Sequence, residues 1–261
     1  MKKDRFLTKG INPTKFHKVS HIALVVLVLV GFVWLSVHLI GLELDFGTLF
    51  RYRNRLWQGF LMTILISVGS LVVSLFIGLI AALGQEYKVL FVQYFCKTYV
   101  QIIRGTPLLV QIYFFYYIIG TAWGLDNRYV AGIVILSLFE GAYIAEIIRG
   151  GIQSIDRQKY EIALSLGLTS YQTFRFVTFP LVLSRIIPAL AGQFSSIIKD
   201  SSLLSVIAVI ELTQTTQEIS ADNFRMFENY IFVGFLYFLL TFAVSTLSKK
   251  WEKRYHYERR I

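Results

Sequence analysis

Long apolar runs alternate with short polar segments along the whole chain, and this alternation is its dominant pattern. A helix that crosses a bilayer needs about 20 mainly apolar residues. Six runs have about this length and few or no charged side chains, so each predicts a membrane-spanning helix. The six runs cover residues 22–40, 57–83, 100–123, 129–148, 186–210 and 230–248. The pattern therefore predicts an all-α membrane protein with six transmembrane helices.

Two of these runs require comment. The first apolar run is too long for the core of a signal peptide and has no small-residue cleavage site after it, so we expect a retained helix. The segment 176–210 is interrupted by Pro180, Pro188 and charged side chains. We therefore expect an entry segment there, followed by a span that begins near Ile186.

Lys and Arg indicate the orientation of the spans, because cytoplasmic loops carry an excess of these residues. They are concentrated in segments 1–21, 84–99, 149–175 and 249–261, and they are sparser in the segments between the other ends of the spans. This distribution predicts a multi-pass protein with both termini in the cytoplasm. If the first run did not span, the other five helices would keep their orientation and only the N-terminus would move.

Composition supports the membrane class. The chain of 261 residues is 55% hydrophobic and 16% charged, with a mean hydropathy of +0.59, whereas soluble domains carry about 25% charged residues. The net charge of +10 is compatible with nucleic acid, but the cations flank apolar runs, which indicates membrane lipid as the partner and no nucleic acid. Cys96 is the only cysteine, and no Cys/His cluster has the spacing of metal ligands.

An amphipathic segment between two apolar runs stands apart from this pattern. Tyr160, Ala163, Leu164 and Gly167 share one face at helical spacing, and Asp156 is a suitable N-cap. Gly167 is suited to the end of that helix because glycine adopts a left-handed conformation readily. The segment therefore predicts a short helix on the cytoplasmic side.

A second short helix is expected directly after it. Thr169 and Gln172 have the spacing of a capping box, and Pro180 either ends the helix or turns it into the next span. The whole unit, at about residues 152–180, is a helix–turn–helix elbow. By its residues alone it can dock on another protein or lie on lipid headgroups, and these alternatives stay open.

The letters "EIALSLGL…FP" resemble the EAA motif of ABC-transporter permeases. Glu161, Ala163, Gly167 and Pro180 match that motif, and Ile162 stands where its second Ala is usual. Further blocks resemble the polar-amino-acid uptake permeases of the histidine/glutamine type. These blocks are "WQGFLMTILIS" (57–67), "RGTPLLVQ" (104–111), "GAYIAEIIRGGIQSI" (141–155) and "IIKDSSLLSVIAVIEL" (197–212).

The resemblance implies a division of the chain. Residues 57–261 would form a permease domain with the five-helix core of a type I importer and a cytoplasmic coupling helix. Residues 1–56 would hold the cytoplasmic N-terminus, an added transmembrane helix and an outer loop. The implied location is the bacterial plasma (inner) membrane.

The resemblance also implies partners. These are an ATPase subunit dimer, a second permease subunit (identical or homologous) and an extracytoplasmic amino-acid-binding protein. The elbow would dock on the ATPase through Tyr160, Glu161, Ala163, Leu164, Gly167 and Leu168. This chain has no Gly-x-x-x-x-Gly-Lys-Ser/Thr motif, so ATP and Mg would be bound by the separate ATPase, and no cofactor is expected in the chain itself.

Ionisable residues inside a span are costly and usually paired or functional. Gln193, Ser196 and Asp200 share a helical face near the middle of the predicted span. Asp200 could accept the ammonium group of an amino acid, and a structural ion pair between Lys199 and Asp200 is the alternative. Glu140 could meet a cationic substrate or pair with Arg104 or Lys199.

The candidate substrate-binding set contains acceptors for an ammonium group and donors for a carboxylate. A neutral amide at Gln193 favours a polar or uncharged side chain in the substrate. The full set is Arg104, Thr106, Glu140, Gln193, Ser196, Lys199, Asp200 and Ser201.

Three functions are compatible with these features. The leading one is the permease subunit of an ATP-driven importer for a polar amino acid. A stand-alone channel or secondary transporter would use the same intramembrane charges, but it has no motor for the elbow to dock on. An intramembrane enzyme using Glu140 and Asp200 has no supporting motif. The acidic segment 211–229 is either a landing surface for a binding protein or a solvated loop.

Overall fold

The computed structural model describes residues 15–255 and divides the chain into two units, one that ends at Asp45 and one that begins at Phe46. The first unit contains α1 (Lys15–Ile40), whose part Val19–Ile40 is long and apolar enough to cross a membrane. Its apolar side chains are exposed all round the helix. A helix with this property is suited to lipid on every side.

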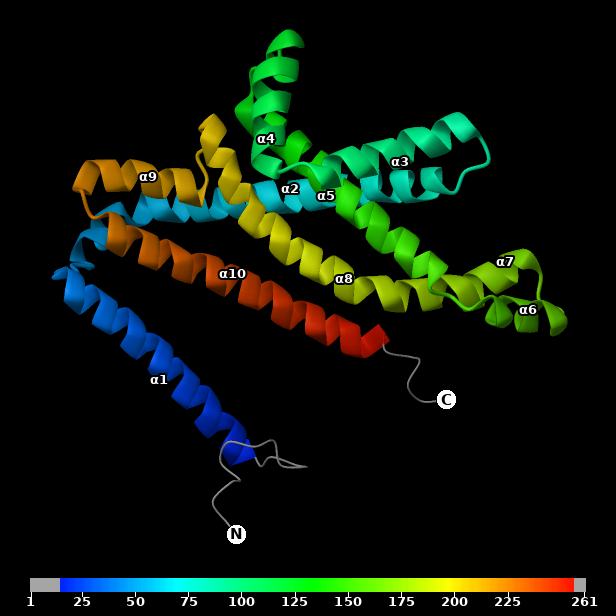
Figure 1. The fold of residues 1–261 in the computed structure, drawn as a ribbon, viewed down its shortest axis with the longest axis horizontal. Helices are drawn as coiled ribbons and strands as arrows, with labels where there is room; N and C mark the ends of the chain where they lie inside the picture. Colours follow the sequence, from blue (N-terminus) through cyan, green and yellow to red (C-terminus); the bar gives the residue numbers. More distant parts are fainter. Residues whose placement is uncertain (1–14, 256–261) are drawn as a thin grey trace. The chain divides into compact units, whose positions relative to one another are not determined.

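The second unit is helical throughout, and the described residues form no β-strand. Its elements are η1 (Gly47–Tyr52), α2 (Arg53–Gln85), α3 (Leu90–Gly105), α4 (Leu108–Tyr113), η2 (Phe114–Gly120), α5 (Arg128–Gln153), α6 (Arg157–Ser165), α7 (Ser170–Thr173), η3 (Phe174–Thr178), α8 (Phe179–Asp200), η4 (Ser201–Ile207), α9 (Leu212–Asn223) and α10 (Met226–Tyr255). Helices α2, α3 and α5 lie side by side, and α9 lies at the opposite end from α6 and α7 (Figure 1).

Helices α2 and α5 form the most extensive contact of this unit, and small residues allow it. A Cβ atom added at Gly78 would lie 2.5 Å from Ile144 Cγ2, and one added at Gly141 would lie 2.7 Å from Ile77 Cγ2. In a membrane no hydrophobic effect drives helices together, so close backbone approach and dispersion supply much of the attraction. The two glycines therefore set the α2–α5 spacing.

The structure corrects the prediction of one continuous span over residues 100–123. Helix α3 ends at Gly105, and the next apolar helix, which begins at Leu108, is bent from it by 112°. The cause is Pro107, because a residue before proline disfavours the helical region and Thr106 is extended (φ −126°, ψ 146°). Segment 84–99, expected as a connector, supplies the first half of α3 instead.

The structure also corrects the start of the span expected near Ile186. Helical structure is continuous over Ser170–Ile207, so the entry segment belongs to the same long element as the span. Pro180 follows the π-helical η3 and lies inside this run, so it does not end the helix, whereas Ala208, with φ +56°, does. Five described helices are long and apolar enough to cross a membrane, or six if the bent pair is one span.

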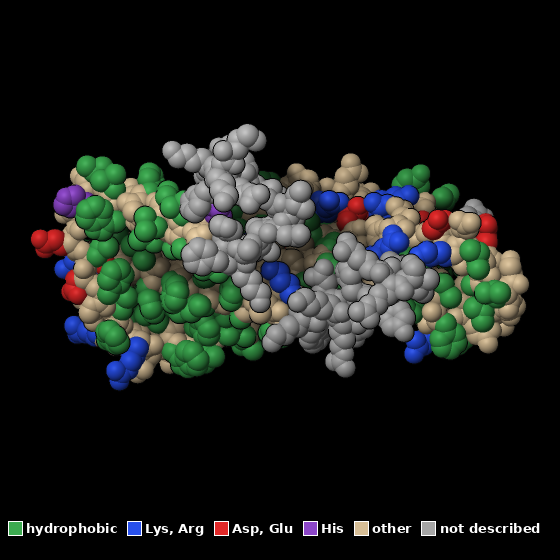
Figure 2. All heavy atoms as spheres, turned by 90° about the horizontal axis from the view of Figure 1, so that it is seen from below, with side chains coloured by type: hydrophobic (Ala, Val, Ile, Leu, Met, Phe, Trp, Pro, Cys, Tyr) green, Lys and Arg blue, Asp and Glu red, His purple; other side chains and the backbone are tan. Residues whose placement is uncertain are grey.

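The surface agrees with a membrane environment. Figure 2 shows many hydrophobic side chains at the surface of the face drawn. Phe235, Phe238 and Phe242 of α10, for example, are each more than half exposed. Exposed apolar area of this extent needs lipid or a protein partner to cover it.

Candidate functional site

A polar cluster joins α5 to α8 within their apolar surroundings. Glu140 comes from α5, and Gln193 and Asp200 come from α8, two turns apart on one face. The Gln193 Nε2 amide donates a hydrogen bond to Glu140 Oε2, and the carboxyl groups of Glu140 and Asp200 are close enough to interact directly. Glu140 is wholly buried, whereas Gln193 and Asp200 are half-buried. We call these three residues the central cluster.

The central cluster is acidic. The described residues form no ion pair with either of its carboxyl groups, and Glu140 Oε1 has no hydrogen-bond partner among them. Lys199 is exposed and attracts Asp200 without forming an ion pair in the described structure. The arrangement therefore offers acceptors to a positively charged group.

The structure separates Arg104 from this cluster. Its guanidinium lies 3.2 Å from Glu146 and 5.4 Å from the centre of the Tyr143 ring. Glu146 also accepts two hydrogen bonds of 2.8 Å from Arg149, as expected for a pair three residues apart on a helix. Glu146 lies six residues after Glu140 on α5, or about 9 Å along its axis. Arg104 thus belongs to a second polar group, nearer the end of α5.

Thr106, Ser196 and Ser201 occupy three further positions. Thr106 lies in the break between α3 and α4, where its hydroxyl accepts a 2.7 Å hydrogen bond from Gln111 Nε2. Ser201 is buried and donates to the Ile198 carbonyl at 2.8 Å. Ser196 is half-buried on α8, one turn from Gln193. Of the eight predicted substrate-binding residues, the structure brings together Glu140, Gln193 and Asp200, with Ser196 and Lys199 nearby on α8.

The first helix of the elbow forms as its sequence predicts. Asp156 caps α6 by accepting a 3.0 Å hydrogen bond from the Gln158 N–H. Gly167 has φ +82° and follows the end of α6. Its N–H donates to the Leu164 carbonyl at 2.9 Å, and the Leu168 N–H donates to the Ala163 carbonyl at 3.2 Å. This pair of bonds is the Schellman motif.

Tyr160, Glu161, Leu164 and Gly167 are exposed on the elbow, and Leu168 is half-buried. Ala163, by contrast, is 3% exposed, and α6 packs against α7 and η3. The small side chain of Ala163 therefore allows close packing within the elbow itself. The other five remain available at its surface.

The second helix of the elbow continues into the span. Thr169 and Gln172 form the predicted capping box at the start of α7. The base of the elbow is tied across α5 and α8, because Arg185 Nη1 donates to the Ser154 carbonyl at 2.5 Å. A Cβ atom at Gly151 would collide with Ile186, so α5 and α8 are also in close contact there.

Comparison with known proteins decides the family. Residues 74–257 match the family described as "Binding-protein-dependent transport system inner membrane component". This chain belongs to that family. It is 37% identical over 216 residues to the glutamine transport system permease protein GlnP of Escherichia coli strain K12, covering 82% of this chain and 98% of that protein.

Other relatives agree. The glutamate/aspartate import permease protein GltK of Escherichia coli O6:H1 is 30% identical over 220 residues, covering 81% of this chain and 98% of that protein. A crystal structure of an amino acid ABC transporter with histidines matches with a TM-score of 0.76 at 33% identity, covering 82% of this chain and all of that chain. The MetNI methionine transporter, at 16% identity and a TM-score of 0.59, shares the fold, covering 79% of this chain and 99% of that one. The chain is thus a multi-pass membrane permease of the amino-acid ABC importer type.

Sequence reasoning missed a buried carboxylate at the other end of this permease. Glu211 Oε1 caps α9 by accepting from the Thr213 and Gln214 N–H groups, and its Oε2 accepts from the Tyr237 hydroxyl at 2.6 Å and from the Thr63 hydroxyl at 3.3 Å. Burial raises the pKa of the Glu211 carboxyl. These hydrogen bonds connect α2, α9 and α10. In the sequence, the position of Glu211 directly before α9 is the only signal that could have indicated a helix cap.

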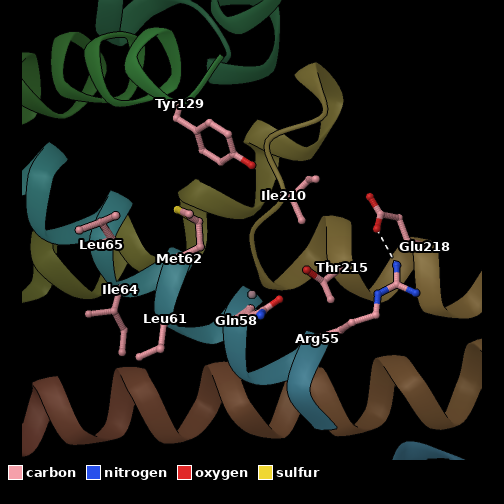
Figure 3. Close-up of a pocket in the computed structure, with 11 residues that line it drawn as sticks. Arg55, Gln58, Leu61, Met62, Ile64, Leu65, Tyr129, Ile210, Thr215 and Glu218 are labelled. Atoms are coloured by element: carbon pink, nitrogen blue, oxygen red, sulfur yellow. Dashed lines mark hydrogen bonds and ion pairs between the residues drawn. The ribbon is translucent and has the colours of Figure 1, made fainter. Parts of the chain in front are cut away.

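An open pocket of about 660 Å³ lies at that same end of the permease, between α2, the start of α5 and α9. Figure 3 shows Met62 and Tyr129 at this pocket and the ion pair between Arg55 and Glu218, whose atoms are 2.7 Å apart. None of the eight residues predicted to bind substrate lines it. The pocket is therefore separate from the central cluster.

Proposed function

We propose that this chain is the membrane subunit of an ATP-driven importer that takes up a polar amino acid at the central cluster. It works with an ATPase dimer, a second permease subunit and an extracytoplasmic binding protein. The observation that carries the proposal is the central cluster within the spans. Two of its residues, Gln193 and Asp200, lie on the helical element that leads from the elbow. The matches to permeases named for glutamine and for glutamate/aspartate support it.

The continuity of that element supplies the coupling. Helical structure runs from Ser170 of the elbow to Ile207, past Gln193 and Asp200. Gln193 lies 15 residues after Thr178, which is about 22 Å along a helix. Residues inside one helix move together, so a displacement of the elbow displaces the α8 side of the cluster against Glu140 of α5. Movement of this kind alternates the access to the site.

The elbow has the surface of a docking element. Leu166 and Tyr171 are more than 70% exposed, and Tyr160 and Leu164 about 40%. These apolar side chains lie on the same elbow as the exposed Gly167. Covering them with a protein groove removes apolar surface from water, which is favourable. This exposed apolar surface supports docking on the ATPase, which is also what the resemblance of the elbow to the EAA motif implies.

The distribution of Lys and Arg places the elbow and both termini in the cytoplasm and α9 outside, in the bacterial plasma membrane. A binding protein would then approach from the α9 end. The acids of this end are engaged within the chain, because Arg55 pairs with Glu218 and Asp222, and Arg225 pairs with Glu228. Contact with a binding protein therefore involves the shape and apolar parts of this end more than free carboxylates.

Reconstitution tests the proposal. The chain is co-purified with its ATPase and second permease and reconstituted in liposomes, the binding protein is added, and uptake of radiolabelled amino acids is measured with and without ATP. We expect uptake only when the ATPase and ATP are present. Uptake by the purified chain alone would refute the proposal and favour the stand-alone transporter.

A further inference from the structure

The charge of the central cluster is not balanced within the described chain. Glu140 and Asp200 bring two carboxyl groups together, and neither forms an ion pair among the described residues. The two cations that the sequence offered are engaged or directed elsewhere, since Arg104 pairs with Glu146 and Lys199 is exposed. Unpaired acidic groups inside a membrane protein are costly, and their presence usually serves a function.

The two oxygens of Glu140 differ in their partners. Oε2 accepts a hydrogen bond from the Gln193 amide, whereas Oε1 is buried without a hydrogen-bond partner among the described residues. Buried polar atoms almost always have a partner. Glu140 Oε1 can therefore accept a hydrogen bond from a further donor. A cationic donor would form a stronger hydrogen bond with this carboxyl group than a neutral donor would.

A count of charges then discriminates among amino acids. Every α-amino acid carries one ammonium group, which one carboxylate of the cluster satisfies. An uncharged side chain leaves the second carboxyl group without a cation, and an acidic side chain adds a further acidic group beside it. A cationic side chain pairs with that second carboxyl group, which no cation of the described chain reaches as an ion pair.

We infer that this permease carries an amino acid with a cationic side chain, which Glu140 and Asp200 bind together. The inference rests on the proposed function and specifies its substrate class. Asp200 and Gln193 are half-buried and Glu140 lies buried behind them, so Gln193 must rotate away before a substrate cation reaches Glu140. A substrate cation would then replace the Gln193 amide as the donor to Glu140 Oε2.

This substrate class differs from the names of two of the relatives. GlnP is named for glutamine and GltK for glutamate and aspartate. The difference makes the inference easy to test, because the three substrate classes differ in side-chain charge.

The test measures direct binding, without the binding protein, so that the selectivity is that of the permease. The complex of permease and ATPase in lipid nanodiscs is titrated with L-arginine, L-lysine, L-glutamine and L-glutamate by calorimetry. We expect arginine or lysine to bind at least about tenfold more tightly than glutamine, a difference of about 1.4 kcal/mol, and glutamate not to bind.

Two variants of Glu140 locate the effect. Glu140→Gln should lower the affinity for the cationic amino acid by at least about tenfold and leave glutamine binding unchanged or tighter. Glu140→Asp, which keeps the charge, should retain the preference for cations. Glu86→Gln removes an acidic group outside the cluster and should change neither affinity.

The outcomes separate the inference from the proposed function. Tighter binding of glutamine or glutamate than of arginine and lysine would overturn the inference and leave the importer intact. A cationic preference that survives in Glu140→Gln would overturn the role of Glu140, provided that the variant still co-purifies with the ATPase. If no amino acid stimulates ATP hydrolysis when the binding protein is present, the proposed function itself fails.

Discussion

Gly167 offers a test of elbow docking in which backbone strain and surface charge can be separated. Its φ of +82° lies in the left-handed region, and a Cβ atom added there would meet nothing within 4 Å. A side chain at this position would therefore touch no other part of this chain. The effects of substitution come from the backbone or from the docked partner.

Three substitutions distinguish these causes. Gly167→Ala costs about 1–2 kcal/mol because alanine disfavours the left-handed region. Asn and Asp adopt this region more readily, and they are nearly equal in size. Gly167→Asn therefore controls for bulk, and Gly167→Asp adds one negative charge. An unpaired charge desolvated in an interface costs several kcal/mol, so the Asp variant should lose roughly 30-fold or more in affinity for the ATPase.

Substrate-stimulated ATP hydrolysis and co-purification with the ATPase measure the effect. We expect Gly167→Asn to couple nearly as the wild type does, whereas Gly167→Asp inserts in the membrane but is uncoupled. Wild-type coupling in Gly167→Asp would refute the docking role of this surface. Equal loss in the Asn and Asp variants would assign the effect to bulk and not to charge.

Four further predictions concern the span, the elbow base and the α9 end. Asp200→Asn should lower amino-acid uptake by at least about tenfold without loss of ATPase association, and unchanged affinity and rate would leave Asp200 a structural role only. Arg185→Met removes the donor to the Ser154 carbonyl, and we expect this to weaken the elbow base by about 0.5–1.5 kcal/mol. Substrate-stimulated ATP hydrolysis should fall, and the basal ATP hydrolysis should stay as in the wild type. Tyr237→Phe removes the shortest hydrogen bond to Glu211 and should lower the free energy of unfolding by about 1–3 kcal/mol. Burial raises the pKa of the Glu211 carboxyl, so between the ordinary carboxyl pKa and the raised value the folded state holds a proton that the unfolded state has released. The free energy of unfolding should therefore fall as the pH rises through this range. Glu211→Gln should remove this pH dependence.

Features determined by neighbours in the sequence were predictable. The caps of the elbow at Asp156 and Thr169 and the left-handed Gly167 all depend on residues at most five apart, and the structure confirms each of them. The break before Pro107 had an equally local signal in the disfavoured helical conformation of Thr106. Apolar periodicity concealed it, because both halves of the broken run are hydrophobic.

The partners of the intramembrane charges were not predictable. Gln193 meets Glu140 across 53 positions of the chain, and no local rule selects that contact over a pair between Glu140 and Arg104. The buried Ala163 shows the same limit, since its helical face alone did not reveal whether α7 or a partner covers it.

The sequence alone determined that this is an all-α membrane protein with a capped elbow, because hydrophobic length, capping and turn chemistry act over a few residues, and the resemblance of its motifs indicated a permease. Only the tertiary structure decided which charges meet. It joined Arg104 to Glu146 and left Glu140 beside Gln193 and Asp200 without a counter-ion in the described chain. The reason is physical: the free energy of a charge inside a membrane depends on its neighbours in space, and helix packing brings those neighbours from distant parts of the chain.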